Sequence, residues 1–594
     1  MSRELNRRQF IHVVMSSAAG AYLGASAAGC GPGNEISRPD SLSDAVFSNG
    51  VASGDPSPDS VIIWTRVVPP TTGPVSVRYE VATDNKFTSA IATGTVEAVS
   101  DWDHTLRIRV EGLEPYTHYY YRFFALDGRS AVGRTKTAPL PEQDVPVRFA
   151  VASCQDFVGR WYHSWRSLAS EPEVDFVLFL GDYIYESIAD PRHQFPQPGR
   201  ELSLPDGLNI HPDVEGGEGD LRAHTLADYR ALYKQYKVDR DLQEAHRLFP
   251  FISIWDDHEF ANDCWRDYST DLNEAEGSEQ NTKRREDATR AWYEYQPIDV
   301  SFHEGKSFPD DITIYRNLRY GKHVELFLTD QRYYRDDHLI PEGPMDSEVG
   351  KFLENSPLGS RIFAKREGFD KRESAAKPTM LGSAQRKWFV ESVQKSKATW
   401  KAWASALMVS EMAMDLRQVS GVPELFANDY YFKLDHWDGF RSERNEILAA
   451  LSNVDDLVIF SGDLHGFYAS HVLADYDKNV GASSAVATEF TTSGISSIPL
   501  QDQLNLFTKN DPLLSLLKLD EAVAQFDDVL LDSNAHYVES DSRHNGITIV
   551  EADAHAVKVE WLRALDVTDA AAPKEADRLI FEVQQGTRKI SRKA

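Results

Sequence analysis

The sequence has few cysteines and no excess of basic residues. Only three of its 594 residues are cysteine, too few for a disulfide-rich scaffold. Asp and Glu number 92 against 63 Lys and Arg, which gives a formal net charge of −29. A chain this acidic is not expected to bind nucleic acid, because polyanions are repelled by it. A metal or a few arginines could still attract an anionic substrate inside one site.

Long apolar runs and common hydrolase motifs are also missing. The stretch from Phe10 to Gly29 is rich in Ala, Gly and Ser and is interrupted by His12. It differs from a transmembrane helix, which needs about 20 mostly apolar residues. The sequence has no Gly-x-Ser-x-Gly nucleophile elbow and no Gly-rich phosphate loop ahead of a helix. A serine hydrolase of the elbow type and a P-loop enzyme are therefore not expected.

The first thirty residues have the pattern of an export signal. The segment Asn6–Ile11 contains Arg7 and Arg8, and Phe10 and Ile11 follow one residue later. This spacing resembles the twin-arginine signal, which directs folded proteins to the Tat export machinery. We therefore expect residues 1–30 to be a signal peptide and the protein to be periplasmic or exposed at the cell surface.

The end of this signal leaves two alternatives open. Ala27–Cys30 resembles a bacterial lipobox, although Ala27 stands where such sites usually carry Leu. Cys30 is therefore either lipidated, which would anchor the protein to a membrane by lipid only, or lies close to an ordinary cleavage site. Residues 31–45 contain Pro and Gly and are expected to form a linker.

Residues 46–138 have the pattern of a small all-β domain. Short alternating segments recur with turn residues between them, as in Ser60–Val67, Val75–Val81, His104–Val110 and Thr117–Ala125. The segment Gly112–Phe123 resembles the corner and following strand of a fibronectin-like sandwich. No residue of this domain is assigned to a chemical role.

A larger α/β domain is predicted over residues 146–565. Its apolar runs do not alternate, which is typical of strands covered on both faces. They are Val147–Ala152, Phe176–Leu180, Phe251–Trp255, Val324–Leu328 and Leu457–Phe460. Helical patterns lie between them, for example over Leu226–Phe249 and Gln385–Lys395.

Polar residues that suit a binding site follow each of these five runs. They are Cys154, then Asp182 and Tyr185, then Asp257 and His258, then Arg332, and finally Asp463 and His465. Any single Asp after a strand is more often a helix cap or a turn residue. Five such strand ends are better explained by one site, because ligands of α/β sheets bind beyond the carboxyl ends of the strands.

The residue types at these strand ends favour a metal site. A turn after a strand can bring Asp182 and Tyr185, three residues apart, to the same ion. Asp463 and His465 lie two residues apart and so point to the same side of an extended segment. A phenolate is a hard ligand, which favours a strongly Lewis-acidic metal.

Taken together, the motifs resemble those of the PhoD-type alkaline phosphatases and phosphodiesterases, a metallophosphatase family. The matching segments are Ala152–Gln155, Gly181–Glu186, Trp255–Glu259 with Asn262, Leu328–Arg335, Leu381–Trp388 and Ser461–Gly466. The resemblance implies an α/β core of two stacked sheets flanked by helices, with residues 566–594 as a C-terminal extension. It also implies a secreted enzyme that hydrolyses phosphate monoesters, diesters or both by in-line attack of a metal-activated water.

The resemblance implies iron(III) and calcium as cofactors. By this likeness Cys154, Asp182 and Tyr185 would hold the iron, and Asp182 would be shared with calcium. Asp463 and His465 would complete the metal shell.

Further roles follow from the same likeness. Asp257, His258 and Asn262 occupy the stretch where metallophosphatases keep a metal-ligating Asn and a catalytic His. His258 would protonate the leaving alkoxide. Arg332, with Arg335, would clamp the phosphate oxygens of the substrate.

Two rival interpretations remain to be weighed. A purple-acid-phosphatase-like enzyme also combines a β domain with Gly-Asp-x-x-Tyr, but it expects an Asp at Cys154, Gly-Asn-His in place of Asp256–His258, and Gly-His-x-His in place of Gly462–His465. A non-catalytic surface lipoprotein that binds a polymer or a partner would leave the five polar strand ends unexplained. Composition also leaves open a disulfide between Cys154 and Cys264, although the context of Cys154 favours a metal ligand.

Overall fold

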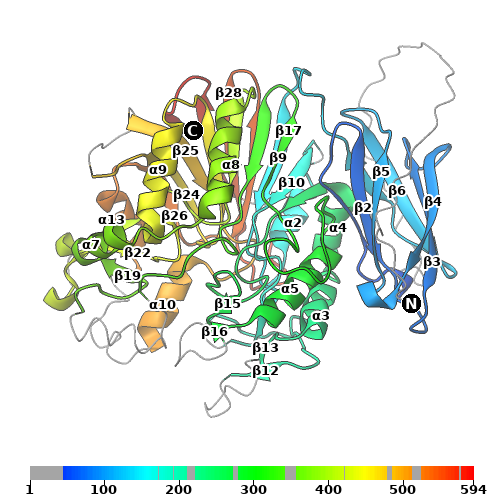
Figure 1. Cartoon of the computed structure of the whole chain (residues 1–594), viewed down its shortest axis with the longest axis horizontal. Helices are drawn as coiled ribbons and strands as arrows, with labels where there is room; N and C mark the ends of the chain where they lie inside the picture. Colours follow the sequence, from blue (N-terminus) through cyan, green and yellow to red (C-terminus); the bar gives the residue numbers. More distant parts are fainter. Residues whose placement is uncertain are drawn as a thin grey trace. The chain divides into compact units, whose positions relative to one another are not determined.

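The computed structural model describes residues 45–593, except 172, 191–192, 211–220, 272–278, 341–355, 420–421, 478–483, 511–522 and 574–576. The predicted signal peptide, Cys30 and almost all of the linker lie outside the described residues. The chain divides into two compact units (Figure 1). The first comprises the chain up to Leu140 with Leu242–Phe251 and Glu294–Asp299, and the second comprises the remainder.

The first unit is built from antiparallel strands. Three of them pair in the order β1-β2-β5, and a second sheet has the order β4-β3-β6-β7, with β8 also paired to β6. The strands are β1 (Val51–Gly54), β2 (Ser60–Arg66), β3 (Val75–Ala82), β4 (Ala90–Ala98), β5 (Thr105–Glu111), β6 (His118–Ala125), β7 (Gly128–Arg129) and β8 (Gly133–Lys136). The predicted β domain is confirmed, and its strand spacing follows from the alternating sequence.

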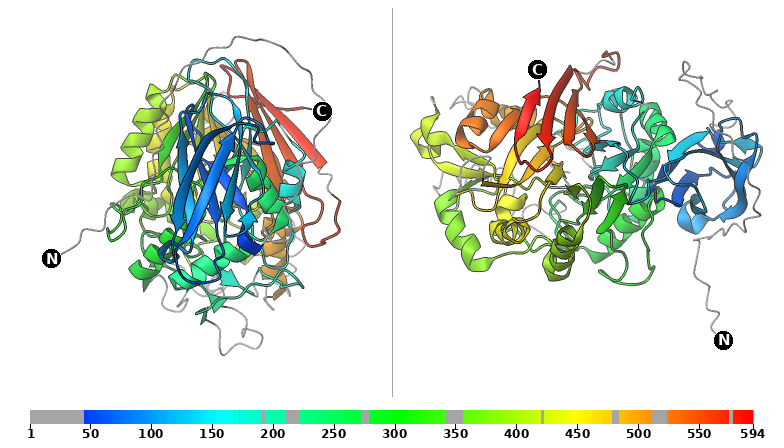
Figure 2. Two further views of the ribbon diagram at one scale, coloured as in Figure 1. Left: turned by 90° about the vertical axis from the view of Figure 1, so that its right-hand side faces the viewer. Right: turned by 90° about the horizontal axis from the view of Figure 1, so that it is seen from above.

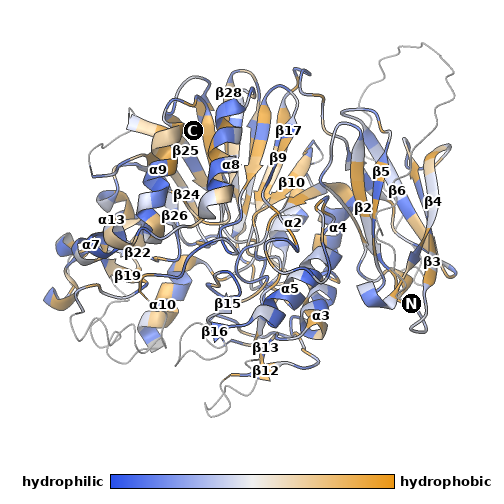
Figure 3. Ribbon diagram, viewed as in Figure 1, coloured by the Kyte–Doolittle hydropathy of each residue, from blue (hydrophilic) through white to orange (hydrophobic). Residues whose placement is uncertain are grey.

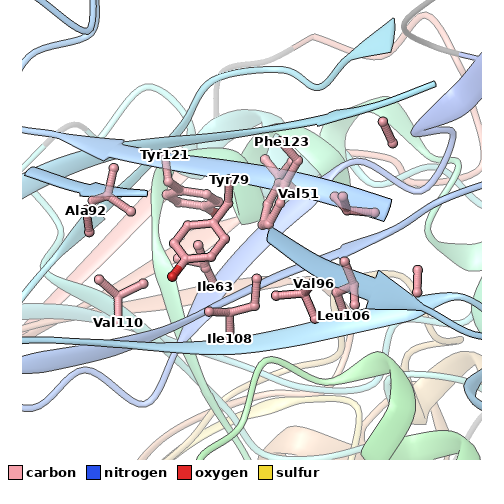
Figure 4. Packing of buried hydrophobic residues seen from close by; sticks show 14 of the residues in the cluster. Val51, Ile63, Tyr79, Ala92, Val96, Leu106, Ile108, Val110, Tyr121 and Phe123 are labelled. Carbon is pink, nitrogen blue, oxygen red and sulfur yellow. The ribbon is translucent and has the colours of Figure 1, made fainter. Parts of the chain in front are cut away.

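One hydrophobic core joins the two sheets of this unit. Strand β6 buries every second residue, including Tyr121 and Phe123, and β5 does the same with Ile108 and Val110. These side chains lie together with Tyr79 of β3 (Figure 4). Alternate residues of a strand point to opposite faces, so the period of two in the sequence produces this sandwich.

The first sheet of the second unit carries three of the predicted strand ends side by side, those of β9, β10 and β14. Its strands run in the order β30-β29-β28-β27-β9-β10-β14. They are β9 (Val147–Ala152), β10 (Phe176–Phe179), β14 (Pro250–Ser253), β27 (Gly546–Ala552), β28 (Ala556–Arg563), β29 (Asp577–Gln584) and β30 (Ile590–Lys593). Strands β9 and β10 are parallel, whereas β27 to β30 continue the sheet in antiparallel fashion (orange to red in Figure 2).

The second sheet has the order β17-β18-β20-β23-β25-β24-β26. Its strands are β17 (Arg316–Tyr320), β18 (Val324–Leu328), β20 (Trp400–Ala404), β23 (Leu457–Ser461), β24 (Phe467–Leu473), β25 (Ala485–Thr491) and β26 (Tyr537–Asp541). Strands β18, β20, β23 and β25 are parallel. The two sheets pack face to face through aromatic side chains. Phe149 of β9 contacts Phe460 of β23, edge of one ring to face of the other, with ring centroids 5.5 Å apart.

Helices cover the outer faces of this two-sheet sandwich. Helices α8 (Gly382–Lys395) and α9 (Arg441–Leu451) pack on the second sheet through a core that includes Phe389 and Leu448. Helix α2 (His163–Leu168) packs beside β27 and β28. The strands of the two sheets are rich in apolar residues, whereas α5 (Thr282–Tyr295) is largely hydrophilic (Figure 3). The predicted α/β core of two sheets flanked by helices is confirmed.

Two sequence-based boundaries look different in the structure. The stretch Leu226–Phe249 forms two helices, α3 (Leu226–Tyr236) and α4 (Arg240–Leu248). Residues 566–594, predicted as an extension, contain β29, which pairs with β28 of the first sheet, and β30, which pairs with β29. Among the described residues, no helix combines the length and apolarity required to cross a membrane.

Candidate metal centre

Four of the predicted site residues adopt left-handed backbone conformations directly after strands. Cys154, Asp182, Asp463 and His465 have φ angles of 56°, 57°, 65° and 50°. This region is unfavourable for residues other than glycine by about 1–2 kcal/mol each. Strain of this kind persists only where the surrounding structure fixes it, and it clusters at functional sites. The sharp turns direct these side chains to the carboxyl ends of β9, β10 and β23.

Tyr185 and His465 meet as the sequence predicts. The Tyr185 hydroxyl lies 3.2 Å from Asp182 Oδ2 and 3.2 Å from His465 Nε2, and it accepts a hydrogen bond from Ser497 Oγ at 2.6 Å. His465 Nδ1 lies 2.9 Å from the Ile498 carbonyl oxygen, which can only accept. Nδ1 therefore carries the hydrogen, and the lone pair on Nε2 points into the site. Burial lowers the pKa of His465 to about 3, so the ring is neutral and suited to bind a metal.

Cys154 completes this side of the site. Ligand atoms of Cys154, Asp182 and His465 all lie within 4.8 Å of one another. Burial, reinforced by the charge of Asp182, raises the pKa of the Cys154 thiol well above its usual value. A cation would be needed to hold this thiol as a thiolate. Cys154 and Cys264 are both buried and free, so the alternative of a disulfide between them is wrong.

A group of carboxylates forms the other side. Asp182, Asp256, Asp257 and Asp463 also have ligand oxygens within 4.8 Å of one another. Burial raises the pKa values of Asp182, Asp256 and Asp257, and their mutual repulsion adds to the effect. Gathering so many buried carboxylates is unfavourable unless a positive charge lies between them.

Glu259 links the two loops that carry these carboxylates by hydrogen bonds. One of its oxygens accepts the backbone N–H groups of Asp182 at 3.0 Å and Asp256 at 2.8 Å, and the other accepts that of Tyr183 at 2.6 Å. The side chain thus ties the end of β10 to the end of β14. Glu259 was not predicted as a site residue, because its partners are backbone groups far away in sequence.

His258 is held by a second carboxylate. Its Nδ1 lies 2.6 Å from Glu186 Oε2, and the ring packs on Tyr185 with centroids 4.1 Å apart. Glu186 Oε1 also accepts the backbone N–H of Asn262 at 2.9 Å, which keeps the predicted residue Asn262 next to the site. Burial would lower the pKa of His258, but Glu186 and the neighbouring aspartates hold it well above its usual value. His258 is thus held as a protonated donor.

The predicted phosphate clamps are already bound by carboxylates. Arg332 Nη1 donates to Asp435 Oδ2 at 2.7 Å, its Nε donates to Asp256, and Arg335 Nη1 donates to Asp435 Oδ1 at 2.9 Å. Both arginine side chains are completely buried. In the structure these guanidinium groups therefore hold Asp256 and Asp435 in place. Their role as phosphate clamps stays a prediction.

Asp463 is bound by two residues that sequence reasoning did not assign. Its Oδ2 accepts from Lys433 Nζ at 2.9 Å and from His436 Nε2. Although burial works in the opposite direction, these two groups hold the pKa of Asp463 well below its usual range. The segment containing Asp435 and His436 shows in sequence only as a polar and aromatic patch, which we would read as a loop contact.

The residues present fit a site for more than one cation. Asp182 belongs to three sets of ligand atoms: with Cys154 and His465, with Asp257 and His258, and with the other aspartates. A residue common to three sets is suited to bridge two cations. The first set offers sulfur, nitrogen and oxygen donors, whereas the aspartate set offers only oxygen.

The fold and these donor sets define a metal-dependent hydrolase of the α/β class, with a β domain at its N-terminus. Residues 149–561 match the family of PhoD-like phosphatases, and residues 34–139 match the PhoD-like phosphatase N-terminal domain. The chain belongs to the PhoD-like phosphatase family. It is 31% identical to alkaline phosphatase D of Bacillus subtilis (strain 168) over 505 residues, which cover 83% of this chain and 76% of that protein.

One solved structure agrees with this assignment. A structure of PhoD superposes with a TM-score of 0.70 at 26% identity and covers 95% of this chain and 94% of that chain. A purple acid phosphatase from yellow lupin (Lupinus luteus) seeds, PPD1, covers 88% of this chain and 73% of that chain, with a TM-score of 0.47 and 9% identity. The family matches and the PhoD structure confirm the resemblance stated from the sequence motifs, and with it the metallophosphatase fold.

Proposed function

We propose that this phosphatase is an exported phosphoesterase that uses iron(III) and calcium to hydrolyse phosphate monoesters, diesters or both. The observation that carries the proposal is the position of Asp182, whose carboxylate is common to three sets of ligand atoms. Bound cations at such a site supply Lewis-acid charge to the phosphoryl oxygens. The family membership supports phosphatase activity. The choice of metals and the identity of the proton donor rest on the residues of the site.

The choice of metals rests on the donor atoms. Cys154, Tyr185 and His465 bring a thiol, a phenol and a neutral imidazole to Asp182, a mixed set that suits a transition metal such as iron(III). Asp182, Asp256, Asp257 and the nearby Asn262 offer oxygen atoms, which calcium prefers. Binding at the first set would displace the protons of the thiol and the phenol, because burial keeps both pKa values high.

His258 would donate a proton to the leaving oxygen of the ester. Glu186 accepts from its Nδ1 at 2.6 Å, so Nε2 is the nitrogen that can serve the substrate. The ring packs against Tyr185 at an interplanar angle of 33°, which restricts its rotation. Glu186 thereby fixes both the tautomer and the direction of the imidazole, as carboxylates do for catalytic histidines.

The location of the enzyme and its partners follow from the sequence motifs alone. The twin arginines at Arg7 and Arg8 support passage through the Tat machinery to the periplasm or cell surface, with Cys30 as a lipid anchor or as part of the signal. The substrate is a phosphate ester, and a nucleic-acid scaffold is not expected as a partner because the chain carries a formal charge of −29.

Metal analysis and paired substrates test the proposal. The purified enzyme should contain iron and calcium and should hydrolyse an aryl monophosphate, a bis-aryl phosphate or both. Chelation should abolish turnover, and restoring the two metals should recover it. Asp182→Ala should remove both metals and all activity while the chain stays folded by circular dichroism. Normal turnover by metal-free protein or by Asp182→Ala would refute the proposed function.

A further inference from the structure

The cations around the metal centre differ in how far they reach solvent. Arg332 and Arg335 are completely buried, and Arg361 is 5% exposed; all three are bound by carboxylates. The side chain of Lys433 is 29% exposed and still lies against Asp463. Of these four, Lys433 is therefore the one whose side chain an incoming anion can reach from solvent.

The backbone of Lys433 is fixed in an unfavourable conformation. Lys433 follows β22 (Asp429–Phe432) and has a φ of 57°, in the left-handed region. Its N–H donates to the Ile362 carbonyl at 2.7 Å, and the next N–H, of Leu434, donates to the Arg361 carbonyl at 2.9 Å. A lysine adopts this conformation only where its surroundings impose it. The strained turn points the side chain towards the metal centre.

Lys433 and His436 share one oxygen but are not equivalent. Both donate to Asp463 Oδ2, yet His436 is 4% exposed and its ring is rigid. Lysine carries its charge on a flexible four-carbon stem with three donor hydrogens, so its ammonium can move several ångströms without any change in the backbone. His436 alone suffices to orient Asp463 as a ligand, and Lys433 is the donor that can move.

We propose that Lys433 binds a phosphoryl oxygen of the substrate when cations occupy the site, while His436 alone continues to orient Asp463. The attraction between Lys433 and Asp463 depends on the negative charge of that carboxylate. A cation bound beside Asp463 reduces this attraction, and an anionic phosphate then becomes the stronger partner for the ammonium. The inference rests on the proposed function, because it takes a phosphate ester as the substrate.

Inorganic phosphate and an aryl phosphate serve as probes in the metal-loaded, full-length enzyme. Lys433→Met should raise the inhibition constant for phosphate and the KM for the ester together by about 10- to 100-fold, as expected for loss of a hydrogen bond to a charged group. Its iron and calcium content should equal that of the wild type. Lys433→Arg should restore part of the phosphate affinity, because a positive charge returns.

Two further variants separate substrate binding from metal binding. His436→Ala should lower the metal content, because Asp463 loses its rigid donor. Lys371→Met is the matched control: Lys371 is 74% exposed and pairs with Glu367 at 2.9 Å, the same distance as in the Lys433 pair. It should behave as the wild type. In chelator-treated protein, Lys433→Met should lower the Tm, because Asp463 then keeps only one donor.

The possible outcomes are distinguishable. An unchanged phosphate inhibition constant in Lys433→Met would overturn the inference, and so would a parallel loss of metal, which would make Lys433 a residue that positions Asp463. A wild-type enzyme that binds inorganic phosphate through Lys433 but hydrolyses no phosphate ester would instead refute the proposed function and leave only phosphate binding by Lys433 standing.

Discussion

Replacing Gly181 by alanine should separate backbone strain from crowding at the metal centre. Gly181 has a φ of +105° and lies between the two loops that carry the ligands. A Cβ added there would overlap the backbone nitrogen of Asp256 and come within 2.8 Å of the Trp255 carbonyl carbon. The carbonyl of Gly181 also accepts the N–H of Cys154 at 3.1 Å. A shift at Gly181 must therefore move ligands on both sides of the site.

The size of the effect follows from two contributions. A positive φ costs a residue with a Cβ about 1–2 kcal/mol. Overlap with backbone atoms that cannot rotate away adds about 1–3 kcal/mol, as for other overpacked positions. Gly181→Ala should thus lower the free energy of unfolding by about 2–5 kcal/mol. A ligand displaced by about 1 Å should also cost about 100-fold in kcat/KM.

The assay pairs urea unfolding with kinetics on an aryl phosphate, and Gly586→Ala is the control. Gly586 has a φ of +72° but has nothing within 4 Å of an added Cβ, so it isolates the contribution of the backbone. We expect it to lose about 1–2 kcal/mol and no activity. If Gly181→Ala kept full activity, or lost no more stability than Gly586→Ala, the argument that Gly181 permits the close approach of the two loops would be refuted.

Three further predictions concern the metal, the proton donor and a buried lysine. Tyr185→Phe should abolish the visible absorption band that a tyrosinate on iron(III) gives; an unchanged spectrum would remove Tyr185 from the iron site. Glu186→Gln should lower the pKa of His258 by removing its carboxylate partner, so the alkaline limb of the pH–rate profile should move at least one pH unit lower. Burial lowers the pKa of Lys237 to about 7, against about 10.4 when exposed. Between these two pH values the unfolded chain binds a proton that the folded chain does not, so the free energy of unfolding decreases as the pH falls from about 10 to 7. Below about pH 7 this loss of stability is complete. Lys237→Met should therefore raise the free energy of unfolding at pH 6 by up to about 4 kcal/mol and much less at pH 10, and equal gains at both pH values would contradict this.

The sequence predicts the strands of the fold only where burial and apolarity coincide. The run Val147–Ala152 matches β9 residue for residue, and Val324–Leu328 matches β18. Strands β24 and β25 are completely buried too, yet they carry Ser470 and Glu489, so no apolar run marks them. Glu489 is tolerated there because it accepts the N–H groups of Val409 and Ser410. Such partners lie about 80 residues away and leave no local pattern.

The same reasoning explains which site residues were found. Cys154, Asp182, Tyr185, Asp463 and His465 follow strands directly, and parallel strands bring their carboxyl ends together, so the sequence alone places them in one site.

The position of strand ends does not predict that Lys433 and His436 belong to the site. They follow β22, which lies in the small sheet β19-β22-β21 and not in either large one, with β19 at Phe363–Lys365 and β21 at Ala413–Asp415. Their approach to Asp463 is set by the tertiary fold. The proposed ligands are therefore predictable from the strand ends, whereas Lys433 and His436, which supply compensating charge to Asp463, follow a strand that no apolar run marks. Connecting segments generally vary more between relatives than the elements they connect, so we expect differences in substrate preference between relatives of this enzyme to arise from segments such as the one that carries Lys433.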